Sequence, residues 1–430
     1  MTKANFSGKM ALYMKQSELF TKTRKEISGD EVSRNAELLG RGGFIHKEIA
    51  GVYTYLPLGH RVLKKIEKII REEMDQIGGQ EISMTVLQNP ELWKKTGRWS
   101  DKVVDSWFKT KLKNDTELGL GFSHEEPLVN LLSNFTSSYK DLPLAVYQIQ
   151  TKFRNELRAK SGILRGREFL MKDMYSFHAD EEDFKLFYEK VKVAYKNIFK
   201  RVGIGHLTYL TFASGGIFSK YSHEFQTLTP AGEDTIYVSE ENGMAVNSEV
   251  LNDEVLENLG LEREKLTETR AIEVGNIFDL KTKYSESFDL SYTDPKGKKH
   301  PILMGCYGIG LGRLMGTVVE VLSDDKGIIW PEEIAPFAVH LLPLSNGSDK
   351  VSQYADQVYE RLESSKIEVL YDDREGLSAG EKFADADLLG IPYRAVVSER
   401  SLKENGIEVK KRIEERGEII SLESLIKMLK

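Results

Sequence analysis

Apolar and polar positions alternate along the chain in patterns that predict both helices and strands. In residues 62–74, apolar side chains recur at helical spacing between charged ones, which predicts an amphipathic helix. Pro57 and Gly59 mark its start and Gly78 its end, since proline and glycine interrupt regular structure. Residues 81–87 follow as a predicted strand. A helix of this kind is typical of ordinary core packing.

The segment 145–157 alternates with period two and is predicted to be a strand. One face of it carries a row of polar side chains, namely Gln148, Gln150, Lys152, Arg154 and Glu156. A second strand-like run, 168–177, follows a loop rich in Arg, Lys and Gly, which predicts an antiparallel hairpin with a long basic tip. Residues 152–172 contain seven basic and two acidic residues, which favours an anion site. The alternative is an edge hairpin that charge protects from aggregation.

Residues 304–315 place glycines at 305, 308, 310 and 312 before Arg313 and an apolar stretch. A glycine-spaced turn that enters a helix can bring backbone N–H groups close to a phosphate. The spacing is neither a dinucleotide-binding nor a Walker pattern, and tight packing of a helix on a sheet would also require these glycines.

The chain between these two segments and after them also shows regular patterns. A helix is expected at 180–202 and strands at 207–212 and 235–238. Beyond Trp330, the chain changes character and predicts a separate α/β domain of 336–430. Its expected strands are 337–344, 368–372, 393–398 and 407–411, and its expected helices 349–364, 378–390 and 422–429.

Composition narrows the class of protein. The chain has 430 residues, 40% of them hydrophobic and 30% charged, which is typical of a soluble protein with two or three domains. No apolar run is long enough to span a bilayer and no targeting signal is visible. We therefore expect a protein that does not associate with a membrane and that is located in the cytoplasm. A single cysteine, Cys306, excludes an internal disulfide and a cysteine-built zinc site, and we expect no zinc. The net charge of −7 argues against a polycation, although a local basic surface remains compatible with nucleic acid.

Read together, the hairpin and the glycine run resemble the three motifs of class II aminoacyl-tRNA synthetases. Phe153-Arg154-Asn155-Glu156 and then Arg165-x-x-x-Phe169-x-x-x-Asp173 are similar to motif 2. Gly308-x-Gly310-x-Gly312-Arg313 is similar to motif 3. Tyr55-Leu56-Pro57-Leu58-Gly59 with the helix after it resembles motif 1, which forms the dimer in that class, so the resemblance implies a homodimer.

Longer stretches resemble bacterial-type prolyl-tRNA synthetases from about residue 12 to the C-terminus. They include SHEEPL from Ser123, REFLMKDMYSFH from Arg167, GCYGIG from Gly305 and GIIWPEEIAPF from Gly327. The resemblance implies an α+β catalytic domain with a mainly antiparallel sheet flanked by helices, followed by an α/β anticodon-binding domain. The implied boundaries are 1–247 and 272–335 for the catalytic domain, 248–271 for a short connector, and 336–430 for the anticodon-binding domain.

The resemblance also assigns residues to ATP. Arg154 would contact the α-phosphate and the amino-acid carboxylate, Glu156 would read the adenine amino group, and Phe169 would stack on adenine. An arginine fork suits phosphate or carboxylate, and a phenylalanine ring is a flat apolar platform. Arg165 and Arg313 would hold the γ-phosphate, so that Arg154 and Arg313 are the expected catalytic residues.

Glu273 matches the family's acidic or amide side chain near Mg²⁺ and the phosphates. For proline, Ser123 and Glu125 match the Thr-x-Glu loop, whose glutamate pairs with the secondary ammonium of the substrate. Cys306 falls beside the ring pocket, where a small buried thiol is a better interpretation than a nucleophile. Asn276 replaces the usual histidine and Ser123 the usual threonine, and these are two departures from the family pattern among the residues expected to bind proline.

In the C-terminal domain, the resemblance is best over YDDREGLSAGEKFADADLLGIPY from Tyr371. Arg374, Lys382, Phe383 and Asp385 are the candidates for contact with anticodon bases, because RNA loops are recognised by stacking and by hydrogen bonds to base edges. The alternative is an ordinary charged start of a helix.

The implied activity is ATP-dependent ligation of L-proline to tRNA(Pro) through prolyl-adenylate, with pyrophosphate and then AMP released. Many bacterial relatives carry an editing insertion between the positions of Asn247 and Ile272, and about 24 residues fill that gap here. We therefore expect no built-in editing, with removal of mischarged alanine left to a separate hydrolase.

Three other functions remain possible from the sequence: a non-catalytic synthetase-like regulatory or accessory subunit, an adenylate-forming enzyme acting on another carrier, and a related enzyme specific for threonine or glycine. Loss of the motif arginines is usual in the first, and Arg154 and Arg313 are present.

Overall fold

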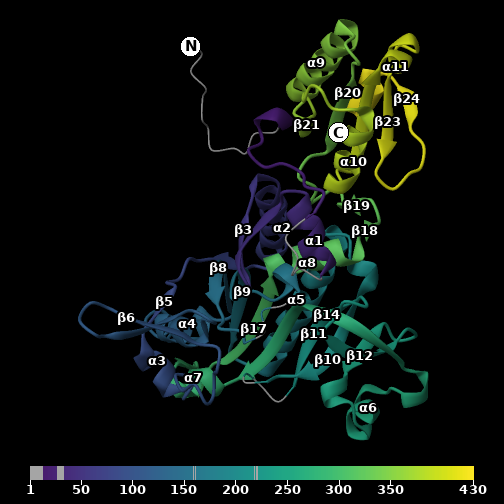
Figure 1. Cartoon of the computed structure of the whole chain (residues 1–430). Coiled ribbons are helices and arrows are strands. Elements are labelled where there is room, and N and C mark those ends of the chain that lie inside the picture. The colour runs from purple at the N-terminus through teal and green to yellow at the C-terminus, as the bar shows by residue number, and fades with distance from the viewer. Residues whose placement is uncertain (1–12, 27–32, 158, 160, 217, 219–220) are drawn as a thin grey trace. The chain divides into compact units, whose positions relative to one another are not determined.

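A computed structural model describes residues 13–26, 33–157, 159, 161–216, 218 and 221–430 (Figure 1). Contacts divide the chain into two compact units. The larger unit comprises 47–53 and 66–321, and the smaller unit comprises 1–46, 54–65 and 322–430. Three elements contain residues of both units: β2 (Ile45–Ile49), β3 (Val52–Tyr55) and α2 (Pro57–Gln76). The predicted amphipathic helix is therefore confirmed as α2.

A nine-stranded sheet forms the centre of the larger unit, and most of its neighbouring strands are antiparallel, as predicted. Its order is β11 (Tyr221–Leu228), β10 (Thr208–Ser214), β13 (Met244–Asn247), β12 (Asp234–Ser239), β14 (Thr267–Lys281), β17 (Leu303–Gly310), β9 (Glu168–His178), β8 (Leu144–Phe153) and β4 (Gln80–Glu81). The predicted hairpin is confirmed, because β8 and β9 pair antiparallel from Leu144↔Phe177 to Phe153↔Glu168.

Helices and small sheets surround this sheet. The helices of the larger unit are α3 (Pro90–Lys95), α4 (Glu125–Leu132), α5 (Glu181–Arg201), α6 (Asp253–Leu259), α7 (Lys283–Ser287) and α8 (Leu311–Val321). The 3₁₀ turns are Tyr139–Asp141, Gly162–Leu164, Gly205–Leu207, Ser248–Val250 and Arg263–Lys265. The small sheets contain β5 (Leu87–Gln88), β6 (Phe108–Lys111) and β7 (Glu117–Leu120), and β15 (Ser291–Thr293) with β16 (Lys299–Pro301).

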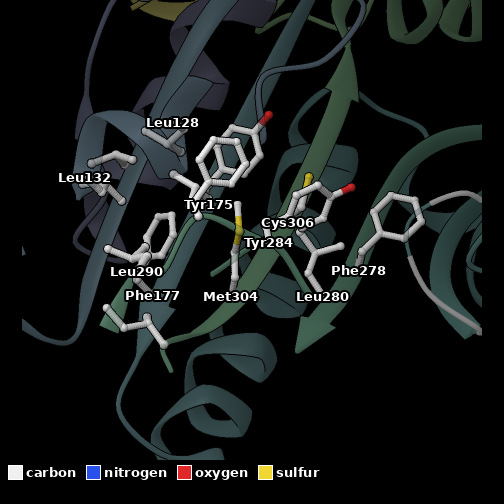
Figure 2. Packing of buried hydrophobic residues seen from close by; sticks show 14 of the residues in the cluster. Leu128, Leu132, Tyr175, Phe177, Phe278, Leu280, Tyr284, Leu290, Met304 and Cys306 are labelled. Atoms are coloured by element: carbon white, nitrogen blue, oxygen red, sulfur yellow. The ribbon is translucent and has the colours of Figure 1, made fainter. Parts of the chain in front are cut away.

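The core of the larger unit lies on the apolar positions of the central strands. Side chains from β9, β14 and β17 meet there, among them Phe177, Phe278 and Met304, with α4 contributing Leu128 (Figure 2). Helix α5 packs on β9 and β17, and α8 packs on β9, β14 and β17. This burial fixes the strands whose ends carry the predicted site.

The smaller unit contains a six-stranded sheet with the order β1 (Tyr13–Lys15), β21 (Val369–Tyr371), β20 (Val339–Leu344), β22 (Tyr393–Ser398), β23 (Ile407–Lys411) and β24 (Glu418–Ile420). The other elements are α1 (Arg34–Arg41), α9 (Asp349–Ser364), α10 (Ala379–Leu389), α11 (Glu399–Lys403), α12 (Leu422–Met428), the 3₁₀ turn Gln16–Glu18, β18 (Ser323–Asp324) and β19 (Gly327–Ile328). The predicted α/β elements are thus all present, and the sheet gains β1 from the N-terminal segment.

Two local expectations were wrong. Residues 81–87 form no continuous strand: β4 ends at Glu81 and β5 begins at Leu87. The glycines at 305, 308 and 310 lie in β17 and not in a turn, and this strand runs directly into α8. A Cβ atom at Gly308 would lie 2.6 Å from Met171 Cε and 2.8 Å from Asn276 Oδ1, so close packing of neighbouring strands explains that glycine.

Within the described residues, no helix is both long and apolar enough to cross a membrane.

Gly59 provides a test of the start of α2. A Cβ atom there would lie 2.1 Å from the carbonyl oxygen of Phe44, which already accepts a hydrogen bond from the Leu56 N–H. Because this neighbour is backbone, Gly59→Ala should lower the free energy of unfolding by about 2 kcal/mol or more. Urea unfolding followed by circular dichroism measures the change.

Gly380→Ala is the matched control. Gly380 lies in α10 of the same unit, and a Cβ atom there would have Ser378 Oγ, at 4.0 Å, as its nearest neighbour. Alanine there should be neutral or should stabilise the protein by about 0.5–1 kcal/mol. Equal effects of the two substitutions would contradict the close approach of Gly59 to Phe44.

Candidate active site

A cavity of about 390 Å³ lies in the larger unit against strands β9, β11, β14 and β17 of the central sheet. Seven of the residues predicted for ATP and proline line it, namely Arg154, Glu156, Arg165, Phe169, Glu273, Asn276 and Arg313. They come from the loop between β8 and β9, from β9 and β14, and from the first turn of α8. The structure therefore brings together the predicted motifs 2 and 3, which lie more than a hundred residues apart.

The basic tip of the hairpin is only partly described, since Arg158 and Lys160 lie outside the described residues. The remainder of the loop folds back onto the unit: the Arg154 N–H donates to the Arg167 carbonyl at 2.8 Å. Ile163 and Leu164 are buried, and the Leu164 carbonyl accepts a hydrogen bond from Arg313 Nε at 2.8 Å. This contact ties motif 2 to motif 3.

Arg154 follows directly after the end of β8. Its guanidinium carbon lies 5.3 Å from the centre of the Phe169 ring, and its Nε donates to the Phe122 carbonyl at 3.4 Å. Burial lowers the pKa of Arg154, and the neighbouring charge of Arg313 lowers it further. A partly buried cation beside a second cation favours an incoming anion, so the position suits a phosphate or a carboxylate.

The other two arginines of the cavity are paired with carboxylates. Arg165 contacts Glu156 and Glu233, each at 3.1 Å, and Arg313 Nη1 contacts Glu273 Oε2 at 3.1 Å. Burial tends to lower the pKa of Arg165, but the two carboxylates outweigh it and raise that pKa overall. These ion pairs hold the arginine side chains in place. An anionic ligand would have to displace the carboxylates in order to contact the two arginines.

The sequence did not identify the acidic wall of the cavity. Glu224 on β11 and Asp234 at the start of β12 line it beside Glu273. Gln226 Nε2 donates to both, at 2.9 Å to Glu224 and 2.8 Å to Asp234. Burial and the Glu273 charge raise the pKa of Glu224 to about 8, and burial raises that of Asp234. No local pattern marks these residues, because strand pairing alone brings them to the site.

Asn276 holds Glu273 on the same strand. Its Nδ2 donates to Glu273 Oε1 at 2.7 Å, while Arg313 approaches the other oxygen of that carboxylate. Asn276 stands opposite Gly308 in the pairing of β14 with β17. The side chain that replaces the expected histidine therefore supports the predicted Mg²⁺ residue and also lines the cavity.

The three other residues predicted for proline form a buried group outside the lining of this cavity. Glu125 accepts hydrogen bonds from Ser123 Oγ, from Tyr175 OH at 3.3 Å and from Cys306 Sγ at 3.4 Å. Burial favours the neutral form of Glu125, but the positive charge of Arg98 and the hydrogen bonds to the carboxylate, among them that from Ser123, together outweigh it and hold the pKa below its usual range. Burial and the nearby Glu125 charge raise the pKa of Cys306 well above its usual range, so the thiol stays protonated at neutral pH.

The candidates for anticodon contact lie in the smaller unit around Asp372. Arg374 donates to both Asp372 oxygens at 2.8 Å and pairs with Asp385 at 2.9 Å. Lys382 is buried and donates to the Asp372 carbonyl at 2.9 Å. Phe383 is half-buried under the Arg394 guanidinium at 4.4 Å. Their contact with RNA stays a prediction.

The N-terminal segment touches this group, which the sequence did not indicate. Ser17 donates to Asp373 through its N–H at 2.9 Å and its Oγ at 2.7 Å, and Thr23 Oγ1 donates to Asp385 at 2.7 Å. Strand β1 pairs in parallel with β21. The segment is thus part of the folded unit that contains Arg374.

Two family models match the chain. The model described as tRNA synthetase class II core domain (G, H, P, S and T) matches residues 108–322, which include every predicted ATP residue. The model described as anticodon binding domain matches residues 338–430. These matches confirm the fold class that the sequence predicted.

Curated relatives match over nearly the whole chain. The proline--tRNA ligase of Zymomonas mobilis strain ZM4 is 38% identical over 440 residues, covering 97% of this chain and 98% of that protein. The enzyme of the same name from Hyphomonas neptunium is 36% identical over 441 residues, covering 97% and 100%. That of Moorella thermoacetica is 33% identical, covering 96% and 97%, but its alignment extends over 560 positions.

A solved structure supports the fold. The prolyl-tRNA synthetase of Giardia lamblia in complex with prolyl-adenylate is similar with a TM-score of 0.75 and 20% identity, covering 90% of this chain and 74% of that one. From the full-length similarity to curated relatives and the match to the class II core, the chain belongs to the family of bacterial proline--tRNA ligases, which are class II aminoacyl-tRNA synthetases.

Proposed function

We propose that this chain ligates L-proline to tRNA(Pro) with ATP, first forming prolyl-adenylate and releasing pyrophosphate, then releasing AMP. The single observation that carries the proposal is the similarity to curated proline--tRNA ligases, in alignments that cover nearly all of this chain and nearly all of each relative. The grouping of the predicted ATP side chains around one cavity supports it.

In the first step, the carboxylate of proline attacks the α-phosphorus of ATP. Arg154, which is half-buried and whose Nε donates to the Phe122 carbonyl, would offset the negative charge that accumulates on the phosphate. Arg165 and Arg313 would exchange their carboxylate partners for the departing pyrophosphate. Catalysis then consists of positioning and charge stabilisation, and it requires no general base.

The acidic wall fits the Mg²⁺ that the family resemblance implies. Six carboxylates line the cavity against three arginines, so a tetraanionic nucleotide would meet an excess of negative charge unless cations came with it. No group of three or more His, Cys, Asp or Glu among the described residues is arranged to hold a metal alone. Mg²⁺ commonly uses one or two carboxylates together with substrate phosphates, and Glu273 with Glu224 or Asp234 would supply them. The ion would offset phosphate charge when bound.

In the second step, the 3′-OH of the terminal tRNA ribose attacks the mixed anhydride and AMP leaves. We propose that the domain 336–430 binds the anticodon, with Arg374, Lys382, Phe383 and Asp385 as the candidate contacts. The half-buried Phe383 ring and the partly exposed Arg374 are the better placed of the four for stacking and for base edges. Lys382 would hold the backbone of Asp372 in place through its hydrogen bond to the Asp372 carbonyl.

The remaining expectations form part of the same proposal. They are the catalytic domain boundaries 1–247 and 272–335, a homodimer formed through the motif 1 region, a cytoplasmic location, and a separate hydrolase that clears mischarged tRNA. The presence of Arg154 and Arg313 at the cavity argues against the non-catalytic alternative, which usually lacks them.

ATP–pyrophosphate exchange without tRNA tests the proposal, because it isolates adenylate formation. Proline should support strong exchange, and threonine and glycine should support little. Alanine and cysteine should give weak exchange, since a pocket shaped for proline cannot exclude them sterically. No exchange with any amino acid would favour the non-catalytic accessory subunit.

Phe169→Ala tests the adenine site. Loss of a stacked ring costs roughly 1–3 kcal/mol, so the KM for ATP should rise about tenfold or more while the KM for proline changes little. Exchange assays with each substrate varied in turn measure both constants. Phe135→Ala is the control, because that ring is 74% exposed and lies outside the cavity lining. An unchanged KM for ATP would remove Phe169 from the site.

The short connector generates a prediction about editing. Residues 248–271 hold a 3₁₀ turn, α6, a second 3₁₀ turn and the first residues of β14, so they contain no room for a further domain. A methylene-sized difference in apolar contact discriminates by only about 1–3 kcal/mol. The purified protein should therefore form some alanyl-tRNA(Pro) and should not deacylate it. Release of alanine from preformed alanyl-tRNA(Pro) would contradict this.

A further inference from the structure

Arg98 connects two adjacent carboxylates in the interior of the larger unit. Its Nη1 lies 3.2 Å from Glu125 Oε2 and 3.0 Å from Glu126 Oε2, and it donates to Tyr284 OH at 2.8 Å. The side chains of all three charged residues are at most 2% exposed. Thr96 Oγ1 completes the group by donating to Glu126 Oε1 at 2.6 Å.

Aromatic rings hold this guanidinium in place. Its central carbon lies 4.8 Å from the ring of Phe218, and the rings of Phe122, Trp93 and Tyr284 are 5.0, 5.2 and 5.5 Å away. The quadrupole of each ring attracts a cation, more strongly where water is excluded. Arg98 is therefore fixed as a charged partner of the two glutamates.

Two carboxylates that share one guanidinium leave the group one negative charge in excess. Glu125 is the residue proposed to pair with the secondary ammonium of proline, and it already contacts Arg98. If Glu126 were neutral, the group would be balanced and would gain little from an added cation. With both glutamates ionised, an incoming ammonium restores neutrality in a buried environment, where charge balance matters most.

We propose that Glu126 is a positioning residue for the substrate amine: without touching substrate, it gives the Arg98–Glu125 pair the excess negative charge that attracts the ammonium of the amino acid. The proposal rests on the proposed function, because it assumes that Glu125 receives the proline ammonium. It assigns Arg98 the complementary role of fixing the geometry of both carboxylates.

Besides Arg98 and Glu125, the groups that interact with Glu126 include the ammonium of Lys283, whose Nζ donates to the Phe218 carbonyl at 3.2 Å, and the hydroxyl of Tyr284. Burial, despite the charge of Arg98, raises the pKa of Glu126 to about 7. Protonation of Glu126 would remove the excess charge, so proline should bind more tightly as the pH rises from 6 to 8. The ammonium of proline stays charged throughout that range.

Pyrophosphate exchange over pH 6–8 tests the proposal, with the KM for proline and the KM for ATP measured separately. The KM for proline of the unmodified protein should fall several-fold as the pH rises. Glu126→Gln keeps the shape and the acceptor for Thr96 but removes the charge. It should raise the KM for proline about tenfold at pH 8, abolish its pH dependence and leave the KM for ATP unchanged. Glu126→Asp keeps the charge and should retain the pH dependence.

Glu91→Gln is the matched control, because it removes a carboxylate whose side chain is 70% exposed and should change neither constant. A KM for proline within twofold of the unmodified value, with the same slope in pH, would overturn the proposal for Glu126. So would equal effects on the KM for ATP and for proline together with a lower melting temperature, since these indicate a purely structural role. Absence of proline-dependent exchange in the unmodified protein would instead refute the proposed function and the inference with it.

Discussion

The ion pair between Lys152 on β8 and Asp173 on β9 is the interaction on which the interior of the larger unit depends. The two side chains are buried, and the Lys152 Nζ lies 2.6 Å from Asp173 Oδ1. Burying either charge alone would cost several kcal/mol, and removing one partner of such a pair typically costs about 3–5 kcal/mol because the other charge stays behind. Asp173 also accepts hydrogen bonds from Gln148 at 2.9 Å and from Tyr175 at 3.1 Å. Since Tyr175 OH reaches Glu125 as well, the pair links the hairpin to the buried carboxylates at the start of α4.

The register of the central strands converts this buried network into an ordered site. Asp173 stands opposite Gln148 on one side and Gly308 on the other, and Gly308 stands opposite Asn276 on β14. A shift of one residue in any of these pairings would turn every side chain of that strand to the other face. The buried charges forbid such a shift, because it would expose apolar side chains and bury unpaired polar ones. Arg154, just past the end of β8, thus keeps a fixed position relative to Glu273.

Much of this fold was predictable from local patterns, and the remainder depends on contacts between distant residues. Helical spacing identified α2, and period two identified β8, because each segment has one face in the core. The prediction of a strand at 81–87 was wrong because the alternating apolar side chains there lie in a loop between two short strands. Glu224 and Arg98 carry no local sign of their role, since pairing of β11 with β14 and packing among aromatic rings create it. The family resemblance identified Arg154, Phe169 and Arg313 as candidates, because the spacing of the motifs can be recognised in the sequence without knowing how the chain packs.

The pairing of arginines with carboxylates at the cavity has a consequence for how an anion would enter it. Arg165 and Arg313 are held in ion pairs, so less side-chain entropy would be lost if they received phosphate, as proposed. The same carboxylates compete with that phosphate, so part of the favourable interaction is offset by separating the existing pairs. Arg154 differs, because its guanidinium is held by the Phe122 carbonyl and the face of Phe169. A partly buried cation that is held by a carbonyl oxygen and the face of a ring interacts strongly with negative charge that develops during reaction. In the proposed reaction, two tasks would then be separate: the paired arginines would orient the polyphosphate, and Arg154 would act where the new bond forms.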